Sequence, residues 1–230
     1  MQALPVVEQP SVAIAGSSAR FPVRRVYCVG RNYADHAKEM GSSGREPPFF
    51  FFKPADALFQ VAEGATADWP YPTLTSDLHH EVELVVAIGK GGKNISPQQA
   101  AQHIWGYAIG LDMTRRDLQA QMKKEAKPWC IGKGFDHGAP IGPLHPIEAT
   151  GEIRSGAIQL RVNGDVRQTG DISDMIWSAS EVIAHISNAW ELQPGDLIYT
   201  GTPAGVGAVK TGDVLTAEAI KVGSFSIRIV

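Results

Sequence analysis

The sequence predicts an α+β fold, a β-rich mixed roll with short helices interspersed among the strands. Three observations favour it. Short runs of β-branched and apolar residues recur along the chain and are bounded by turn residues. Helical patterns occur between them but do not alternate regularly with strands, as they would in a doubly wound sheet. The 24 glycines and 15 prolines have no repeating period and indicate many tight turns.

In the first quarter of the chain, local patterns define five segments. Residues 1–20 resemble an extension or a first hairpin, and 25–29 (RVYCV) form a β-rich run closed by glycine. Residues 32–40 predict a short helix, because the glycine that follows is typical of a helix end. The segment 42–48 (SSGREPP) predicts a loop. We expect 49–52 (FFFF) to be a buried strand.

The middle of the chain carries the clearest strand, residues 81–88, which ends at a glycine. Ser96-Pro97 then predicts a helix that reaches about Trp105, since serine is a good N-cap and proline a good first helical residue. Residues 108–112 are a second apolar strand. The helix-forming run TRRDLQAQMKKEA predicts a helix over 113–126.

The last third of the chain reads as a hairpin, a helix and three further strands. Residues 158–162 and 165–169 flank Asn-Gly, which is a type I′ turn signal. Ser178 and Glu181 have capping-box spacing for a helix that reaches about Trp190. After this helix we expect one strand at LIYTGT (197–202) and two strands within 214–230.

Composition limits the class of protein. A chain of 230 residues with 43% hydrophobic and 20% charged residues has the composition of a folded globular protein and suggests one large domain. The net charge of −3 predicts neither nucleic acid nor an anionic membrane as partner. Two distant cysteines favour a reducing compartment, and no apolar run approaches the roughly 18 residues of a membrane span. We therefore expect a cytoplasmic protein without membrane contact.

Glu81 and Glu83 stand out because they are carboxylates on an otherwise apolar strand. Residues two apart share a face of a strand, so both side chains project together. They belong either to the solvated face of an edge strand or to a site that binds a cation. Asp112, at the end of the next apolar strand, is either a third member of that site or an N-cap for the following helix. Three carboxylates form an all-oxygen site, which suits Mg²⁺ or Mn²⁺.

His36 and Glu39 are three residues apart on the first predicted helix, within reach of each other. A carboxylate beside an imidazole orients it and raises its basicity, which suits a general base that activates water; the alternative is a surface contact. Lys133 lies between glycines and is either a polarising cation or a solvent-exposed turn residue. His79 shares the face of the glutamates, but His79-His80-Glu81 does not continue into the HExxH zinc motif.

Seven segments together resemble the fumarylacetoacetate hydrolase family. In chain order they are YCVGRNYADHAKEM, FFFKPADAL, HHEVELVVAIGK, GYAIGLDMTRRDLQ, PWCIGKGFD, VNGDVRQTGDISDMIW and GDLIYTGTPAGVG. The resemblance implies the β-rich roll of that family's C-terminal domain, with residues 1–20 as an extension and 21–230 as a single catalytic domain. It also implies a lid segment at about 31–48 and a homodimer.

The resemblance further implies roles for individual residues. Glu81, Glu83 and Asp112 would hold one Mg²⁺ or Mn²⁺ per subunit. The catalytic residues would be His36, Glu39 and Lys133. The substrate-binding residues would be Arg116, Gln119, Gly201 and Thr202.

The implied activity is metal-dependent hydrolysis of the carbon–carbon bond of a 2,4-diketo acid (an acylpyruvate). The bacterial members that act on fumarylpyruvate in gentisate degradation are the most similar, so 3-fumarylpyruvate is the expected substrate. Other acylpyruvases, oxaloacetate decarboxylases and the isomerases or decarboxylases of catechol degradation share the scaffold and remain alternatives. A metal-dependent carboxylate-binding protein without turnover is the alternative from another class.

Overall fold

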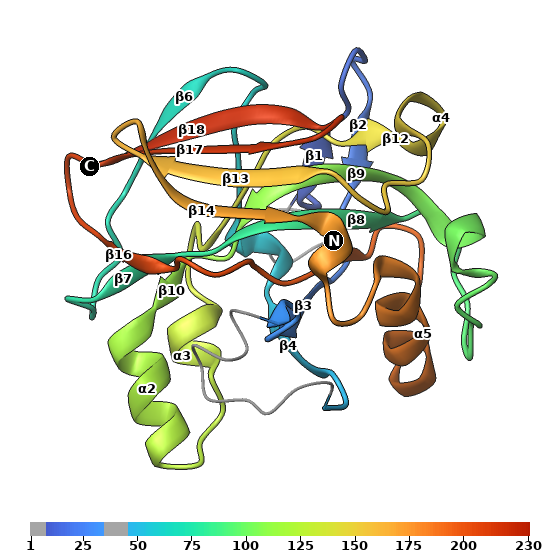
Figure 1. Cartoon of the computed structure of the whole chain (residues 1–230), viewed down its shortest axis with the longest axis horizontal. Coiled ribbons are helices and arrows are strands. Elements are labelled where there is room, and N and C mark those ends of the chain that lie inside the picture. Colours follow the sequence, from blue (N-terminus) through green and yellow to red (C-terminus); the bar gives the residue numbers. More distant parts are fainter. Residues whose placement is uncertain (1–7, 35–45) are drawn as a thin grey trace, which may run out of the picture.

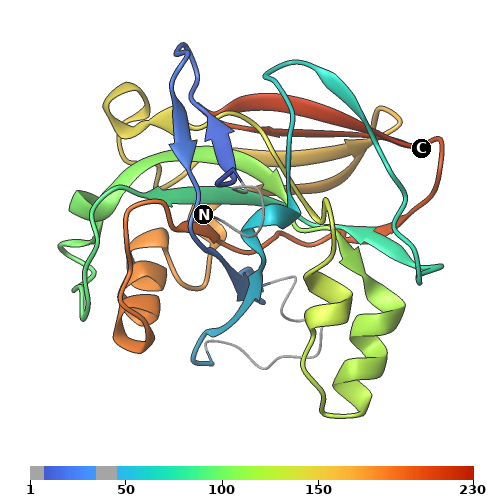
Figure 2. The same ribbon diagram turned by 180° about the vertical axis from the view of Figure 1, so that it is seen from behind.

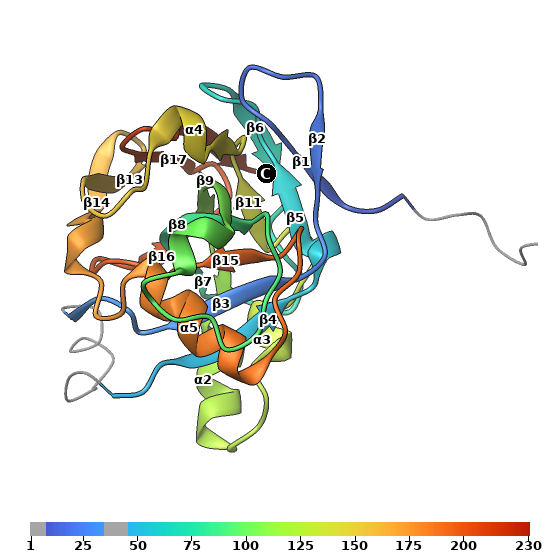
Figure 3. The same cartoon turned by 90° about the vertical axis from the view of Figure 1, so that its right-hand side faces the viewer.

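The computed structural model describes residues 8–34 and 46–230. It is an α+β protein in which two large sheets pack face to face (Figures 1 and 3). The strands of the larger, eight-stranded sheet are β4 (Phe49–Lys53), β3 (Val26–Gly30), β15 (Leu197–Tyr199), β8 (Val82–Ile88), β9 (Ile104–Leu111), β11 (Ala139–Ile141) and β5 (Leu58–Gln60), in spatial order, with β12 (His145–Pro146) paired to β9. The β-rich mixed roll that the sequence predicts is confirmed.

The second sheet has five strands and curls over one face of the first (Figure 3). In spatial order they are β14 (Asp165–Asp171), β13 (Ala157–Val162), β17 (Val214–Ala219), β18 (Gly223–Ile229) and β6 (Thr66–Trp69). Two smaller sheets consist of β10 (Thr114–Arg115), β7 (Leu78–His80) and β16 (Gly207–Val209), and of β1 (Ser11–Ala13) with β2 (Arg20–Pro22).

Four α-helices are described, and Figure 2 shows α2, α3 and α5 below the sheets. They are α2 (Arg116–Lys124), α3 (Cys130–Lys133), α4 (Ile147–Thr150) and α5 (Ala179–Ala189), with 3₁₀ turns at Ala55–Ala57, Ala100–His103 and Ile172–Asp174. No helix within residues 8–34 and 46–230 has the length and apolar character needed to cross a membrane.

The central strand β8 is buried along its whole length and separates two apolar cores. Its alternate residues Leu84 and Val86 face the core under the five-stranded sheet. Val85 and Ala87 face the core that also contains Val12, from the β1–β2 hairpin. Glu83 lies on the same face of the strand as Val85 and Ala87, because alternate residues of a strand share a face. A carboxylate therefore lies on a buried face.

Local signals in the last third of the chain are confirmed. The β13–β14 hairpin turns at Asn163 and Gly164, whose φ angles of 54° and 90° are those of a type I′ turn. Ser178 and Glu181 form both hydrogen bonds of a capping box at the start of α5. Such signals depend on neighbours within a few residues.

Two predictions are wrong. No α-helix covers 96–105: Ser96 bonds the Gln99 side chain, a short 3₁₀ turn follows, and Ile104 already pairs with Ile88 in the sheet. The strand at 49–52 exists but is not fully buried, because β4 is at the edge of its sheet; Phe49 and Phe52 are 37% and 41% exposed. Sheet pairing outweighs local helix signals in the first case, and edge position decides the second.

Candidate metal centre and active site

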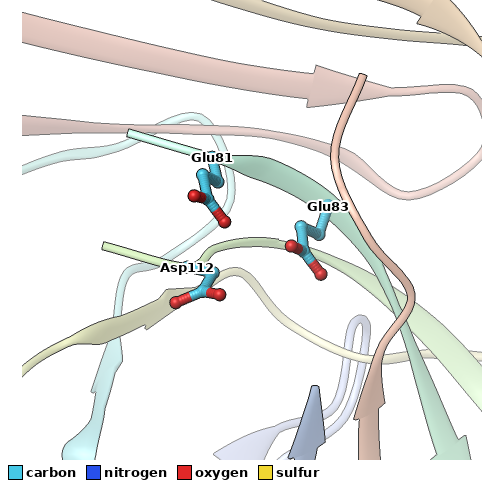
Figure 4. Close-up of side chains that lie close together, drawn as sticks. All are labelled: Glu81, Glu83 and Asp112. Atoms are coloured by element: carbon cyan, nitrogen blue, oxygen red, sulfur yellow. The ribbon is translucent and has the colours of Figure 1, made fainter. Parts of the chain in front are cut away.

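Three acidic side chains converge at the place where β8 begins and β9 ends. Glu81 is the single residue between β7 and β8, Glu83 is the second residue of β8, and Asp112 follows β9. The pairing of Val82 with Leu111 continues outward, and the Asp112 N–H donates to the Glu81 carbonyl at 2.8 Å. This register puts all three side chains on one face, and Figure 4 shows them pointing toward one another.

The three carboxylates are buried, and one oxygen atom from each lies within 4.8 Å of the others. Burial, together with the negative charges of Asp112 and Glu81, raises the pKa of Glu83 well above its usual value. Like charges this close in an apolar setting are costly unless cations compensate them. Because the carboxylates are buried, they do not belong to a solvated strand face. Asp112 is not the N-cap of the following helix either, because α2 begins only at Arg116.

Lys133 provides one compensating charge. Its Nζ donates to Glu81 Oε2 at 2.8 Å, to Asp112 Oδ2 at 2.7 Å and to Thr114 Oγ1 at 2.7 Å. Burial disfavours the ammonium, but the charges of Asp112 and Glu81 outweigh that effect and raise the pKa of Lys133. The residue ends the short helix α3 and is buried, so it is not a solvent-exposed turn residue.

Lys53, the last residue of β4, is a second buried cation that sequence reasoning missed. Its Nζ lies 2.8 Å from Asp112 Oδ1 and donates to the carbonyl oxygens of Met113 at 3.0 Å and of Lys133. The only signal in the sequence was a lysine that closes the apolar run FFFF. Lys53 therefore ties three separate segments together at the acidic cluster.

Arg116 and Gln119, on the first turns of α2, form the next layer. The Arg116 guanidinium pairs with Glu81 Oε1 at 2.5 Å and donates to Gln119 Oε1 at 2.6 Å. Both residues line a cavity with Glu81, Glu83 and Lys133.

Gly201 and Thr202 close the opposite side of the cluster. The Gly201 N–H donates to Glu83 Oε2 at 2.8 Å. Gly201 has a φ of 99°, and a Cβ there would lie 2.6 Å from Asn32 Cβ, so only glycine fits the approach. Thr202 is buried and also lines the cavity.

Gln168, on β14, is a second residue that sequence reasoning missed. Its Oε1 accepts from the Val82 N–H at 3.0 Å and lies 2.9 Å from His80 Nδ1. Its Nε2 donates to Thr202 Oγ1 at 2.7 Å and to the Pro203 carbonyl at 2.8 Å. This fully buried amide joins the start of β8 to the loop of Thr202, a long-range link that no local pattern reveals.

Two further predictions concern histidines. His36 and Glu39 lie outside the described residues, so the dyad stays a prediction. His79 lies in β7, and its Nε2 is 2.9 Å from Asp77 Oδ1. Its hydrogen-bond partner is therefore Asp77, which is not one of the three clustered carboxylates.

The donor set fits a hard divalent cation. All three side chains offer carboxylate oxygens, the ligands that Mg²⁺ and Mn²⁺ prefer. Asp112 Oδ1 is buried and accepts no hydrogen bond from the described residues, although Lys53 Nζ lies 2.8 Å away. Among the described residues this is the one acidic, histidine or cysteine group compact enough to hold an ion.

The chain is similar to known proteins in both sequence and structure. The family model for the fumarylacetoacetate (FAA) hydrolase C-terminal matches residues 25–230. A fumarylpyruvate hydrolase of Ralstonia sp is 44% identical over 80% of this chain and 93% of its own. An oxaloacetate tautomerase of Escherichia coli is 41% identical over 87% of this chain and 90% of its own. The crystal structure of fumarylpyruvate hydrolase from Pseudomonas aeruginosa with Mn²⁺ and pyruvate has a TM-score of 0.98 at 53% identity, covering 100% of this chain and 99% of its own.

Proposed function

The chain belongs to the fumarylacetoacetate hydrolase family, and from that premise we propose that it is a metal-dependent hydrolase that cleaves 3-fumarylpyruvate to fumarate and pyruvate. One observation carries the proposal: three buried carboxylates converge beside a buried lysine, and Glu81, Glu83 and Lys133 line one cavity. The similarity to two fumarylpyruvate hydrolases supports this substrate over other acylpyruvates.

In this proposal Glu81, Glu83 and Asp112 hold one Mg²⁺ or Mn²⁺. When bound, the ion supplies Lewis-acid polarisation of the substrate oxygens and charge for a developing enolate. Arg116, Gln119, Gly201 and Thr202 bind and orient the diketo acid. The single catalytic domain of residues 21–230, the lid at about 31–48 and the homodimer are part of the same proposal.

The bond changes follow from the diketo structure. His36, oriented by Glu39, removes a proton from a water molecule that attacks the 4-keto carbon. Lys133, already held as an ammonium ion, stabilises the negative charge that develops on the 4-keto oxygen. The bond between carbons 3 and 4 then breaks, fumarate leaves with the water oxygen, and carbon 3 of the pyruvate enolate takes up a proton.

A second candidate function has its own support. The chain is also similar to an oxaloacetate tautomerase of Escherichia coli and to an oxaloacetate decarboxylase of Dictyostelium discoideum, the latter 40% identical over 84% of this chain. Oxaloacetate chemistry could use the same acidic cluster without a water-activating base. A carboxylate-binding protein without turnover would use the cluster for affinity alone.

Pyruvate release from a panel of acylpyruvates and oxaloacetate, with added Mn²⁺ or with chelator, separates these functions. We expect metal-dependent hydrolysis of fumarylpyruvate, its loss in Glu81→Gln, and wild-type rates in the exposed control Glu218→Gln. His36→Ala should lose hydrolysis while keeping any oxaloacetate activity. Hydrolysis that persists in chelator would contradict the metal assignment, and turnover of oxaloacetate alone would favour the second function.

A further inference from the structure

Arg31 stands apart from the cations described so far. It follows β3 and lines the same cavity as Glu81, Glu83 and Lys133. Its φ of 57° places it in the left-handed region, which is uncommon for a residue with a side chain. Such backbone positions concentrate at ligand sites, where the surrounding structure holds them.

The guanidinium of Arg31 has no anionic partner among residues 8–34 and 46–230. Its Nε is buried and makes no hydrogen bond to any described residue, whereas Arg116 is paired with Glu81. The guanidinium lies over the Phe49 ring, whose centroid is 5.8 Å from Cζ. A buried N–H without an acceptor is unfavourable, so the site suits an acceptor supplied by a ligand.

The neighbouring charges favour an anion at this end of the cavity. Burial lowers the pKa of Lys123, and the nearby positive charges of Arg31 and Arg116 lower it further. Of the three cations, Arg116 is already paired with Glu81. An arginine that presents parallel N–H groups binds a carboxylate more specifically than a point charge can.

The wall between Arg31 and the acidic cluster is aromatic. Phe49, Phe51 and Trp129 line the cavity, and the rings of Phe49 and Trp129 meet edge to face at 5.4 Å. Flat apolar surface of this kind suits a planar unsaturated carbon chain. The cavity thus offers a metal-type site, an aromatic wall and a guanidinium that has no anionic partner in the described part of the chain.

We propose that Arg31 binds the carboxylate at the far end of the acyl group and so selects dicarboxylic over monocarboxylic acylpyruvates. This rests on the proposed function, since it assigns that function's substrate class. The pyruvate part of the substrate lies at the acidic cluster, and the acyl carbons lie along the aromatic wall.

The test compares kcat/KM for fumarylpyruvate, a dicarboxylate, with that for acetylpyruvate, a monocarboxylate. The variants Arg31→Met and Arg31→Lys keep a side chain that is unbranched at Cβ, so the left-handed backbone angle costs about the same in each. The control is Arg154→Met, which changes an exposed arginine. We expect Arg31→Met to lose roughly 10- to 100-fold on fumarylpyruvate, the range of a charged hydrogen bond, and less than about threefold on acetylpyruvate. Arg31→Lys should retain part of the discrimination.

Equal losses on both substrates would overturn the proposal, because they would indicate a structural or general catalytic role. Unchanged activity on both would overturn it as well. Failure of the proposed function is a separate result: wild-type protein would then release pyruvate from neither acylpyruvate. If Arg31→Met does not fold, the ratio of the two kcat/KM values in Arg31→Lys decides the question.

Discussion

Replacing Lys53 with methionine tests whether the acidic cluster is balanced by buried cations. Methionine is a flexible side chain of similar length that fills the space of the lysine stem without its charge. The Lys53 side chain is 0% exposed and lies 2.8 Å from Asp112 Oδ1. In the wild type, two of the three carboxylates, Glu81 and Asp112, contact three cations, namely Lys53, Lys133 and Arg116. The variant removes one of these three positive charges from the buried cluster.

The expected cost follows from this arrangement. Removing one partner of a buried ion pair typically costs about 3–5 kcal/mol, because the other charge stays buried and uncompensated. Two carbonyl oxygens, of Met113 and Lys133, also lose their donor. Since about 1 kcal/mol corresponds to roughly 2–4 °C for a chain of this size, the midpoint of thermal unfolding should fall by about 6–20 °C in chelator.

A divalent cation should restore part of the loss. The site without Lys53 is more negative, so Mn²⁺ should raise the unfolding midpoint of Lys53→Met more than that of the wild type. The assay is thermal and urea unfolding of wild type, Lys53→Met and the exposed control Lys93→Met, each with chelator and with Mn²⁺. A loss below about 1 kcal/mol, or the same loss with and without Mn²⁺, would refute the reasoning.

Two further predictions concern the hydrogen-bonded link between β7, β8 and β14. Gln168→Leu leaves the Val82 N–H and the Pro203 carbonyl without their buried partner, so we expect a loss of about 2–4 kcal/mol in urea unfolding and a higher KM as Thr202 shifts; wild-type stability and KM would contradict this link. Burial lowers the pKa of His80 to about 4, despite an opposing hydrogen bond to Gln168, so the unfolded chain binds the proton first as pH falls. The contribution of neutral His80 to the free energy of unfolding is therefore complete above about pH 6.5 and falls by up to about 3 kcal/mol toward pH 4. Urea unfolding should show that the free energy of unfolding depends more steeply on pH in the wild type than in His80→Phe. Equal slopes would show that His80 does not titrate in this way.

The sequence could predict those elements whose signals are local. The hairpin at Asn163-Gly164 and the capped helix after Ser178 depend on backbone angles and bonds within four residues, and both are present. The helix expected at 96–105 also rested on a local signal, yet there the pairing of Ile104 with Ile88 is worth more. Local rules hold where no long-range partner competes with them.

For the candidate site, the sequence by itself determined the chemistry of the ligands, and the tertiary structure decided their surroundings. The period of a strand and the change from apolar to acidic residues were enough to single out Glu81, Glu83 and Asp112. Only the β8–β9 register shows that Asp112 lies opposite Glu81. Lys53 and Gln168 act across 60 and 34 residues of chain, from Lys53 to Met113 and from Gln168 to Thr202. Pairings of that kind depend on where distant segments meet, and no pattern along the chain encodes the meeting point.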